Sequence, residues 1–260
     1  MAAEIPVMQA TADTLESLRA HEDLTDANSI GEMIADDPLM TLKVLIHASE
    51  QRGERETAPA ETVTAALVMI GVTPFFRAFD AQPTVEVRLA LEPEAMQGFL
   101  SVQRRAHRSA NFALAMAVHR NDPHAAAIHA AALLHEYTEM LLWATAPRLA
   151  LDIHARQAHD SALRSREAQL AVLGVPIHDI QSTLSAQWRL PTLLTPPTAR
   201  ARSPGTATGT VTVELAARLA RHTSAGWDNP AVAEDVEQIA EALSMSDNAA
   251  LLLLQSVDDE

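Results

Sequence analysis

The sequence predicts an all-α protein, and three features of its composition favour that class. Apolar residues make up 48% of the 260 residues, but aromatic residues only 3%. Ala and Leu supply most of the apolar total, and runs of β-branched residues are few. Only 8 glycines interrupt the chain. Ala and Leu favour helices, whereas sheets use β-branched and aromatic residues. A chain of this length buries a substantial core, as one large domain or as two lobes.

The helices predicted in the first third of the chain follow from local signals. Asp26 and Asp37 each suit the N-cap of a helix, because their carboxylates accept hydrogen bonds from free backbone amides, and Pro38 suits the first helical position. Residues 51–59 are charged and punctuated by Gly and Pro, which predicts a surface loop. The expected helices are residues 11–22, a segment after Asp26, a segment after Asp37, and two segments of residues 62–79 that meet at Gly71.

The rest of the chain is predicted to form a second helical lobe. Residues 83–93 are expected to connect an N-terminal lobe, residues 1–92, to a C-terminal lobe, residues 93–260. Residues 195–210 contain three prolines, two glycines and many small polar residues, so we expect a mobile loop there. The helices expected after residue 93 are residues 94–119, 122–143, 147–159, 161–173 with a stop at Gly174, 177–190, 211–222, 230–243 and 246–255.

Residues 122–143 contain the best candidate for a functional site. No Gly or Pro interrupts the chain from Pro123 to Trp143, and apolar residues lie almost all round, so we predict one uninterrupted, buried helix. His135 and Glu136 are adjacent polar residues within this apolar stretch. A buried imidazole beside a buried carboxylate costs free energy unless each group finds a partner. The pair is therefore expected to be a site or the remnant of one.

Charge and cysteine content exclude several kinds of partner. The formal net charge of −15 argues against binding nucleic-acid phosphates or an anionic membrane surface. The absence of cysteine excludes disulfides and thiolate metal sites, and it is compatible with a reducing cytosol. The N-terminal residues lack the basic and apolar regions of a signal peptide, and no apolar stretch has the length of a membrane span. We expect a cytoplasmic protein that binds neither nucleic acid nor membrane.

Six short motifs occur in an order that resembles a known family. They are IADDPLMTLKVL at 34–45, TAALVMIG at 64–71, HRSA at 107–110, ALLHE at 132–136, GVPIH at 174–178 and QWRLP at 187–191. Together they resemble the HDOD domains, which are non-catalytic signalling relatives of the HD metal-dependent phosphohydrolases. The resemblance covers nearly the whole chain, and it implies an HD-like helical fold with an N-terminal helical lobe and a C-terminal HD-like lobe.

The resemblance also implies a degenerate metal site. HD phosphohydrolases take metal ligands from one His, a His-Asp pair and a later Asp, since imidazole and carboxylate donors suit a divalent cation. His107 and His135 stand at the matching places, but Glu136 replaces the Asp of the pair, and Ala217 stands where the later Asp is expected. We therefore expect a vestigial pocket around these residues and His178, with neither a metal nor a cofactor.

Several interpretations remain open at this stage. His135 and Glu136 can form a structural pair satisfied by neighbouring helices, line a small-molecule or anion pocket, or belong to a working metal centre. The function that the resemblance implies is a non-catalytic, bacterial-type signalling or regulatory protein that acts through a protein partner. The alternatives are a divergent HD phosphohydrolase using His107, His135 and Glu136, and a nucleotide-binding regulator that keeps the pocket without the metal. The partner, the pathway and the oligomeric state are left open. Trp188 is expected to be a core anchor whose N–H bonds a carbonyl.

Overall fold

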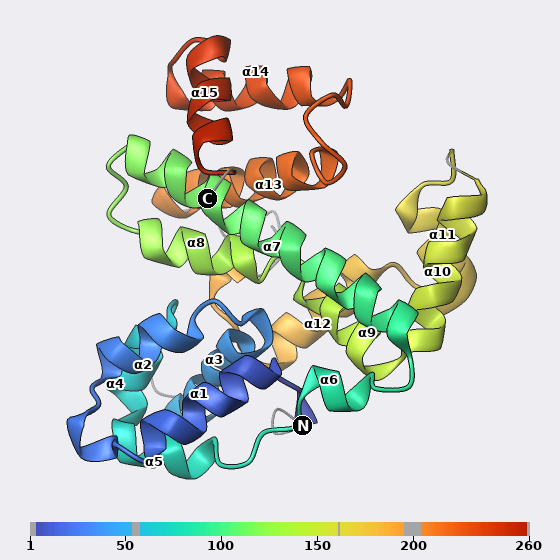
Figure 1. The fold of residues 1–260 in the computed structure, drawn as a ribbon. Coiled ribbons are helices and arrows are strands. Elements are labelled where there is room, and N and C mark those ends of the chain that lie inside the picture. The colour runs from blue at the N-terminus through green and yellow to red at the C-terminus, as the bar shows by residue number, and fades with distance from the viewer. Residues whose placement is uncertain (1–3, 54–57, 161, 195–203, 259–260) are drawn as a thin grey trace. The chain divides into compact units, whose positions relative to one another are not determined.

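The computed structural model describes residues 4–53, 58–160, 162–194 and 204–258 (Figure 1). Across these residues the chain is helical and forms no strand, and extended backbone pairs only at an isolated parallel bridge between Val7 and Thr84. The predicted all-α class is confirmed. No helix in the described part of the chain is long and apolar enough to cross a membrane.

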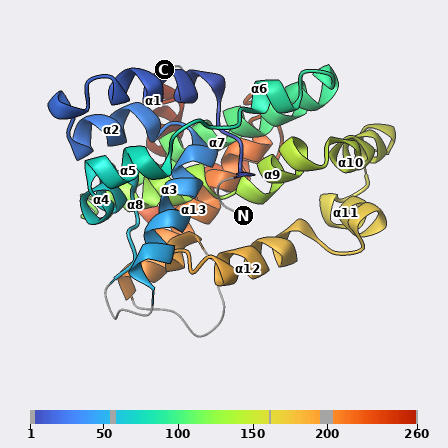
Figure 2. The same ribbon diagram turned by 90° about the horizontal axis from the view of Figure 1, so that it is seen from below.

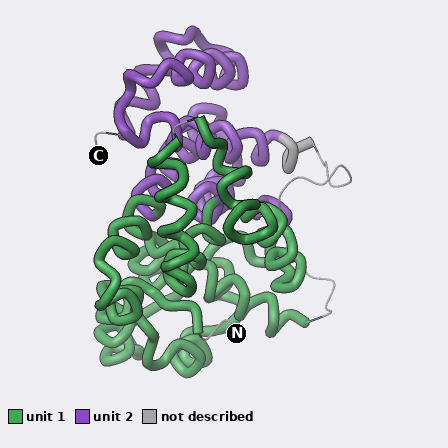
Figure 3. The backbone as a smooth tube through the Cα atoms, turned by 90° about the vertical axis from the view of Figure 1, so that its right-hand side faces the viewer, with its two compact units in different colours: residues 1–102, 136–191 green, residues 103–135, 192–260 purple. Residues whose placement is uncertain are grey.

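Two compact units interleave along the sequence (Figure 3). Unit 1 comprises residues 1–102 and 136–191, and unit 2 comprises residues 103–135 and 192–260. The sequence-based division between residues 92 and 93 followed a proline-bounded segment. In the structure, the first boundary between the two compact units falls inside α7 (Pro93–His119), and the division into two lobes at residues 92 and 93 stays a prediction.

Unit 1 contains the N-terminal helices and the segment that follows Glu136. In both views, α1 to α5 lie together, and α10 lies beside α11 (Figures 1 and 2). Besides the first part of α7, the helices of unit 1 are α1 (Gln9–Arg19), α2 (Ala27–Ile34), α3 (Pro38–Arg52), α4 (Val63–Ile70), α5 (Val72–Ala78), α6 (Val85–Arg88), α9 (Tyr137–Thr145), α10 (Pro147–His159), α11 (Ser165–Leu173) and α12 (Ile177–Gln187).

Local sequence signals place several of these helix ends correctly. The Asp26 carboxylate accepts the Ser29 amide at 2.8 Å and so caps α2. The Asp37 carboxylate caps α3 by accepting the amides of the second and third helical residues at 2.9 and 3.0 Å. α4 ends and α5 begins at Gly71, and α11 ends at Gly174, whose φ of 75° lies in the left-handed region that glycine adopts without a Cβ clash. These predicted boundaries are confirmed.

A buried lysine ties the N-terminal segment to the core of unit 1. Lys43 lies on α3 and is only 2% exposed. Its Nζ donates a hydrogen bond to the Ile5 carbonyl at 2.8 Å and another to the side-chain oxygen of Gln82. The second oxygen of Asp37 accepts the Met8 amide at 2.7 Å. Two polar groups of α3 therefore hold the backbone of residues 5–8, and we refer to these contacts as the N-terminal anchor.

Unit 2 contains the second part of α7 and the C-terminal helices. Its other helices are α8 (Ala125–Leu133), α13 (Pro204–His222), α14 (Val232–Leu243) and α15 (Asp247–Ser256). Residues 204–210 form the first turns of α13, so the loop predicted over 195–210 is wrong for this part; residues 195–203 lie outside the described residues. Pro204 suits a first helical position, and α13 packs closely against its neighbours, since Gly209 lies against Leu193 and Ile128.

An arginine of α7 ties the C-terminal segment to unit 2. Arg108 binds the Asp258 carboxylate in a bidentate pair, with Nε to Oδ1 at 2.5 Å and Nη2 to Oδ2 at 2.7 Å. Its Nη1 donates to the Thr223 carbonyl at 2.6 Å, and its guanidinium lies over the Phe112 ring. The indole N–H of Trp227 also donates to Asp258, at 2.8 Å. We refer to these contacts as the C-terminal anchor.

Candidate functional site

The four residues of the expected pocket are divided equally between the units. His107 lies on α7 and His135 follows α8, both within unit 2. Glu136 precedes α9 and His178 lies in the first turn of α12, both within unit 1. His107, His135 and Glu136 are half-buried, whereas His178 is exposed. Neither unit by itself brings the four residues into one site, so the pocket stays a hypothesis.

The chain turns at His135 and Glu136, and the single helix predicted over residues 122–143 is wrong. α8 ends at Leu133 and α9 begins at Tyr137, and the His135 amide bonds the carbonyl only three residues earlier, at 3.2 Å. Leu133 and Tyr137 are both almost fully buried, so the turn lets each helix place its own apolar face in a core. Glu136 occupies the N-cap position of α9 without a side-chain capping bond. The expected full burial of this pair is also wrong.

The position of the fourth expected ligand, the later Asp, carries no carboxylate. Ala217 is buried within α13, and the nearby Glu214 of the same helix is exposed. Among the residues that the structure describes, no group of three or more His, Cys, Asp or Glu side chains is placed to hold a metal ion.

Unit 2 contains a buried carboxylate that the sequence reasoning missed. Asp235, in the first turn of α14, is 2% exposed. Its two oxygens lie 2.6 Å from Nε of Arg218 and 2.5 Å from Nδ1 of His222, both on α13. Arg218 and His222 are four residues apart, which places them on one face of a helix, and this spacing was the only indication of the site in the sequence. Because each oxygen of Asp235 contacts a side chain of α13, these contacts link α13 to α14.

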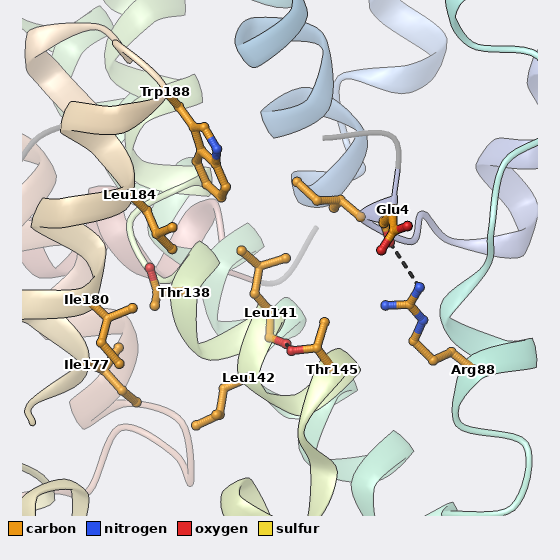
Figure 4. A pocket seen from close by; sticks show the side chains of 11 residues that line it. Glu4, Arg88, Thr138, Leu141, Leu142, Thr145, Ile177, Ile180, Leu184 and Trp188 are labelled. Atoms are coloured by element: carbon orange, nitrogen blue, oxygen red, sulfur yellow. Dashed lines mark hydrogen bonds between the residues drawn. The ribbon is translucent and has the colours of Figure 1, made fainter. Parts of the chain in front are cut away.

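An apolar cavity lies within unit 1, between elements far apart in the sequence (Figure 4). It has a volume of about 340 Å³ and is lined by the N-terminal segment, α6, α9, α12 and Trp188. Tyr137 fixes α9 against α12 beside it, since its hydroxyl lies 3.1 Å from the Gln181 carbonyl and 2.9 Å from Ser185 Oγ. Burial raises the pKa of Tyr137, although the Ser185 hydrogen bond acts in the opposite direction, so the phenol stays protonated at neutral pH.

Trp188 follows α12 and is buried, as predicted, but its polar end differs from the prediction. Its ring lies 6.0 Å from that of Tyr137. No carbonyl or other acceptor among the described residues receives a hydrogen bond from its indole N–H. The expected bond to a carbonyl is therefore absent from the described contacts, and in Figure 4 the indole nitrogen faces the side on which Glu4 lies.

Comparisons with known proteins identify both a family and a fold. The model of the HDOD domain family matches residues 5–204. A solved structure of the MmoQ response regulator from Methylococcus capsulatus str. Bath superimposes with a TM-score of 0.68 at 17% identity, covering 98% of this chain and 99% of that one. A virulence factor from Campylobacter jejuni subsp. jejuni gives a TM-score of 0.62 at 18% identity, covering 96% and 92%. No curated protein matches by sequence.

Proposed function

This chain belongs to the HDOD family, and we propose from that premise that it is a non-catalytic signalling or regulatory module that acts by binding a protein partner. The match covers most of the chain, including the segments on both sides of the His135–Glu136 turn. A regulatory role is supported by one structure of the same fold, which is described as a response regulator. The identity of the partner is a matter for experiment.

The observation that carries the proposal is the pair of changes at the expected metal ligands. Glu136 is one methylene longer than the Asp it replaces, which is enough to displace a metal ligand from productive geometry. The side chain of Ala217 has no atom that can bind a metal, and it is buried in α13, so position 217 supplies no ligand. A divalent metal that activates water needs its full protein ligand set, so these changes support binding over hydrolysis.

Exposed apolar side chains on unit 1 provide the first surface to test for partner binding. Val68 on α4 is 71% exposed and Met33 on α2 is 55% exposed. The two helices pack closely, since a Cβ at Gly31 of α2 would lie 2.3 Å from the Thr64 hydroxyl of α4. Exposed apolar side chains are frequent at protein-binding sites, so these two positions are the first to substitute.

The proposal is tested by affinity capture from an extract of the native host, followed by mass spectrometry. We expect the wild-type chain to retain one protein in fixed proportion, and Val68→Glu to lose it, because a carboxylate in an apolar interface is desolvated without a partner. Leu252→Glu on α15 of unit 2 is the matched control, since Leu252 is also exposed, at 59%. Recovery of no specific protein, from the intact chain and across extract conditions, would contradict the proposal.

A further inference from the structure

The apolar cavity of unit 1 has the dimensions of a small-molecule site. Its volume of about 340 Å³ falls within the range of roughly 300–1,000 Å³ that such sites occupy. Most of its wall is aliphatic and comes from α9 and α12, including Leu141, Ile180 and Leu184. None of the four residues of the HD-like pocket lines it. The cavity is therefore a separate feature, and an inference about it stands or fails independently of the proposed partner binding.

Two polar groups line this cavity without a hydrogen-bond partner among the described residues, and one of them, the Thr138 hydroxyl, is fully buried. Thr138 is 4% exposed. Its hydroxyl lies near enough to the Tyr137 phenol to lower the pKa of Tyr137, but the two side chains form no hydrogen bond of acceptable geometry. The indole N–H of Trp188 also donates to no described acceptor, but its nitrogen is not among the fully buried atoms. Figure 4 shows the Thr138 hydroxyl turned toward Leu184. A buried hydroxyl without a partner costs free energy, so Thr138 calls for a polar group from outside the chain, and the Trp188 N–H is available to the same occupant.

The charges at the cavity favour a neutral occupant. Arg88 and Glu4 are the charged residues among those that line it, and both are exposed. Nη2 of Arg88 donates to the Glu4 carbonyl at 3.0 Å, and the two residues face each other at one end of the cavity (Figure 4). The Glu4 carboxylate offsets the positive charge of Arg88 there. An anionic ligand would therefore exchange its hydration for a weakly positive site, which is unfavourable.

We infer that this cavity binds a small, neutral, largely aliphatic molecule that carries a carbonyl oxygen, as in an aliphatic amide or ester. The carbonyl oxygen accepts a hydrogen bond from the Trp188 indole N–H, and the chain lies against the leucine and isoleucine side chains of α9 and α12. If each non-hydrogen atom with its hydrogens takes up about 30 Å³, the cavity holds a molecule of roughly ten non-hydrogen atoms. The Thr138 hydroxyl provides a second polar contact.

Isothermal titration calorimetry with three compounds of similar length tests this inference on the full chain. Octanamide carries a neutral acceptor, octanoate a charged acceptor, and octylammonium no acceptor. We expect octanamide to bind, octanoate to bind more weakly, and octylammonium to give no binding heat. No binding of octanamide up to its solubility limit would overturn the inference, and so would octylammonium binding as tightly as octanamide. Tighter binding of octanoate than of octanamide would overturn the choice of a neutral ligand.

Variants locate the binding in the cavity. Trp188→Phe keeps the ring and removes the N–H, and we expect octanamide to bind about tenfold more weakly, the order of one lost hydrogen bond. Ile180→Trp fills the cavity from α12 and should abolish binding. Thr183→Trp places the same ring on an exposed position of α12 and should leave the affinity unchanged. Equal octanamide affinity in Ile180→Trp and Thr183→Trp, with both variants folded by circular dichroism, would place the binding elsewhere and overturn the inference.

Discussion

The two anchors hold the two ends of the chain with different chemistry. In the N-terminal anchor, Lys43 is almost fully buried and donates to neutral oxygens, the Ile5 carbonyl and the Gln82 side chain. In the C-terminal anchor, Arg108 is partly exposed and forms a bidentate ion pair with the Asp258 carboxylate. Hydrogen bonds to neutral oxygens offset less of the cost of burying a cation than a bidentate ion pair does.

This difference appears in the pKa values of the two anchors. Burial lowers the pKa of Lys43 to about 8; the Asp37 carboxylate opposes that change, and the charge of Arg88 adds to it. Burial of Asp258 would raise its pKa, but the hydrogen bonds from Arg108 and Trp227, with the charge of Arg108, hold the pKa of that carboxyl below its usual value. The first anchor is therefore sensitive to alkaline pH and the second to acid.

The largest effect is expected from removing the N-terminal anchor. Lys43→Ala leaves the Ile5 carbonyl and the Gln82 side chain without a donor and opens a cavity in the core, so the free energy of unfolding should fall by about 2–5 kcal/mol. Lys43→Met keeps most of the volume and should cost less, which separates the cavity from the hydrogen bonds. Denaturant titration measures both variants. An unchanged midpoint for Lys43→Ala would show that the anchor contributes nothing to stability.

A smaller effect is expected at the C-terminal anchor, because water reaches part of it. Arg108→Ala removes the bidentate pair and the bond to the Thr223 carbonyl, while Trp227 still donates to Asp258. We expect a loss of about 1–3 kcal/mol in the free energy of unfolding. Asp258→Asn keeps the shape of the acid and should cost less than Arg108→Ala. A loss larger than that of Lys43→Ala would reverse the ranking of the two anchors.

The pH dependence of stability sharpens the comparison further. Between about pH 8 and the ordinary lysine pKa of 10.5, the unfolded chain holds a proton at Lys43 that the folded chain has released, so stability should rise with pH across that window. The Asp258 contribution is present above its ordinary pKa of 3.8 and is lost as pH falls through its lower folded pKa. Unfolding measured against pH should lose the alkaline rise in Lys43→Met and the acidic fall in Asp258→Asn. Retention of the alkaline rise in Lys43→Met would assign it to another group.

The sequence predicted those features that depend on local chemistry. The Asp37 cap and the stop at Gly174 follow from side-chain capping and from left-handed backbone, which neighbouring residues determine. The all-α class followed from the composition, and the HDOD family followed from the order of the short motifs. The turn at His135 and Glu136 carries no Gly or Pro signal, because it arises from the burial of Leu133 and Tyr137 on either side.

Tertiary partners were the part of the candidate sites that sequence reasoning could not supply. The spacing of Arg218 and His222 places them on one helix face, but Asp235 reaches them from a different helix. The aromatic character of Trp188 predicted its burial, yet whether its N–H meets an acceptor depends on how α9, α12 and the N-terminal segment pack beside it. Contacts of this kind depend on the packing of distant segments, which periodicity does not encode.

The claim that this chain binds rather than hydrolyses is tested most directly by a phosphodiesterase assay with bis(p-nitrophenyl) phosphate and added Mn²⁺. An active HD phosphohydrolase assayed beside it serves as the positive control. If Glu136 and Ala217 stand at two metal-ligand positions, as the proposal holds, the ligand set is incomplete, and we expect the wild-type chain and His135→Ala to release nitrophenol at the same rate as buffer. Turnover by the wild-type chain that depends on the metal and is abolished in His135→Ala would contradict the account.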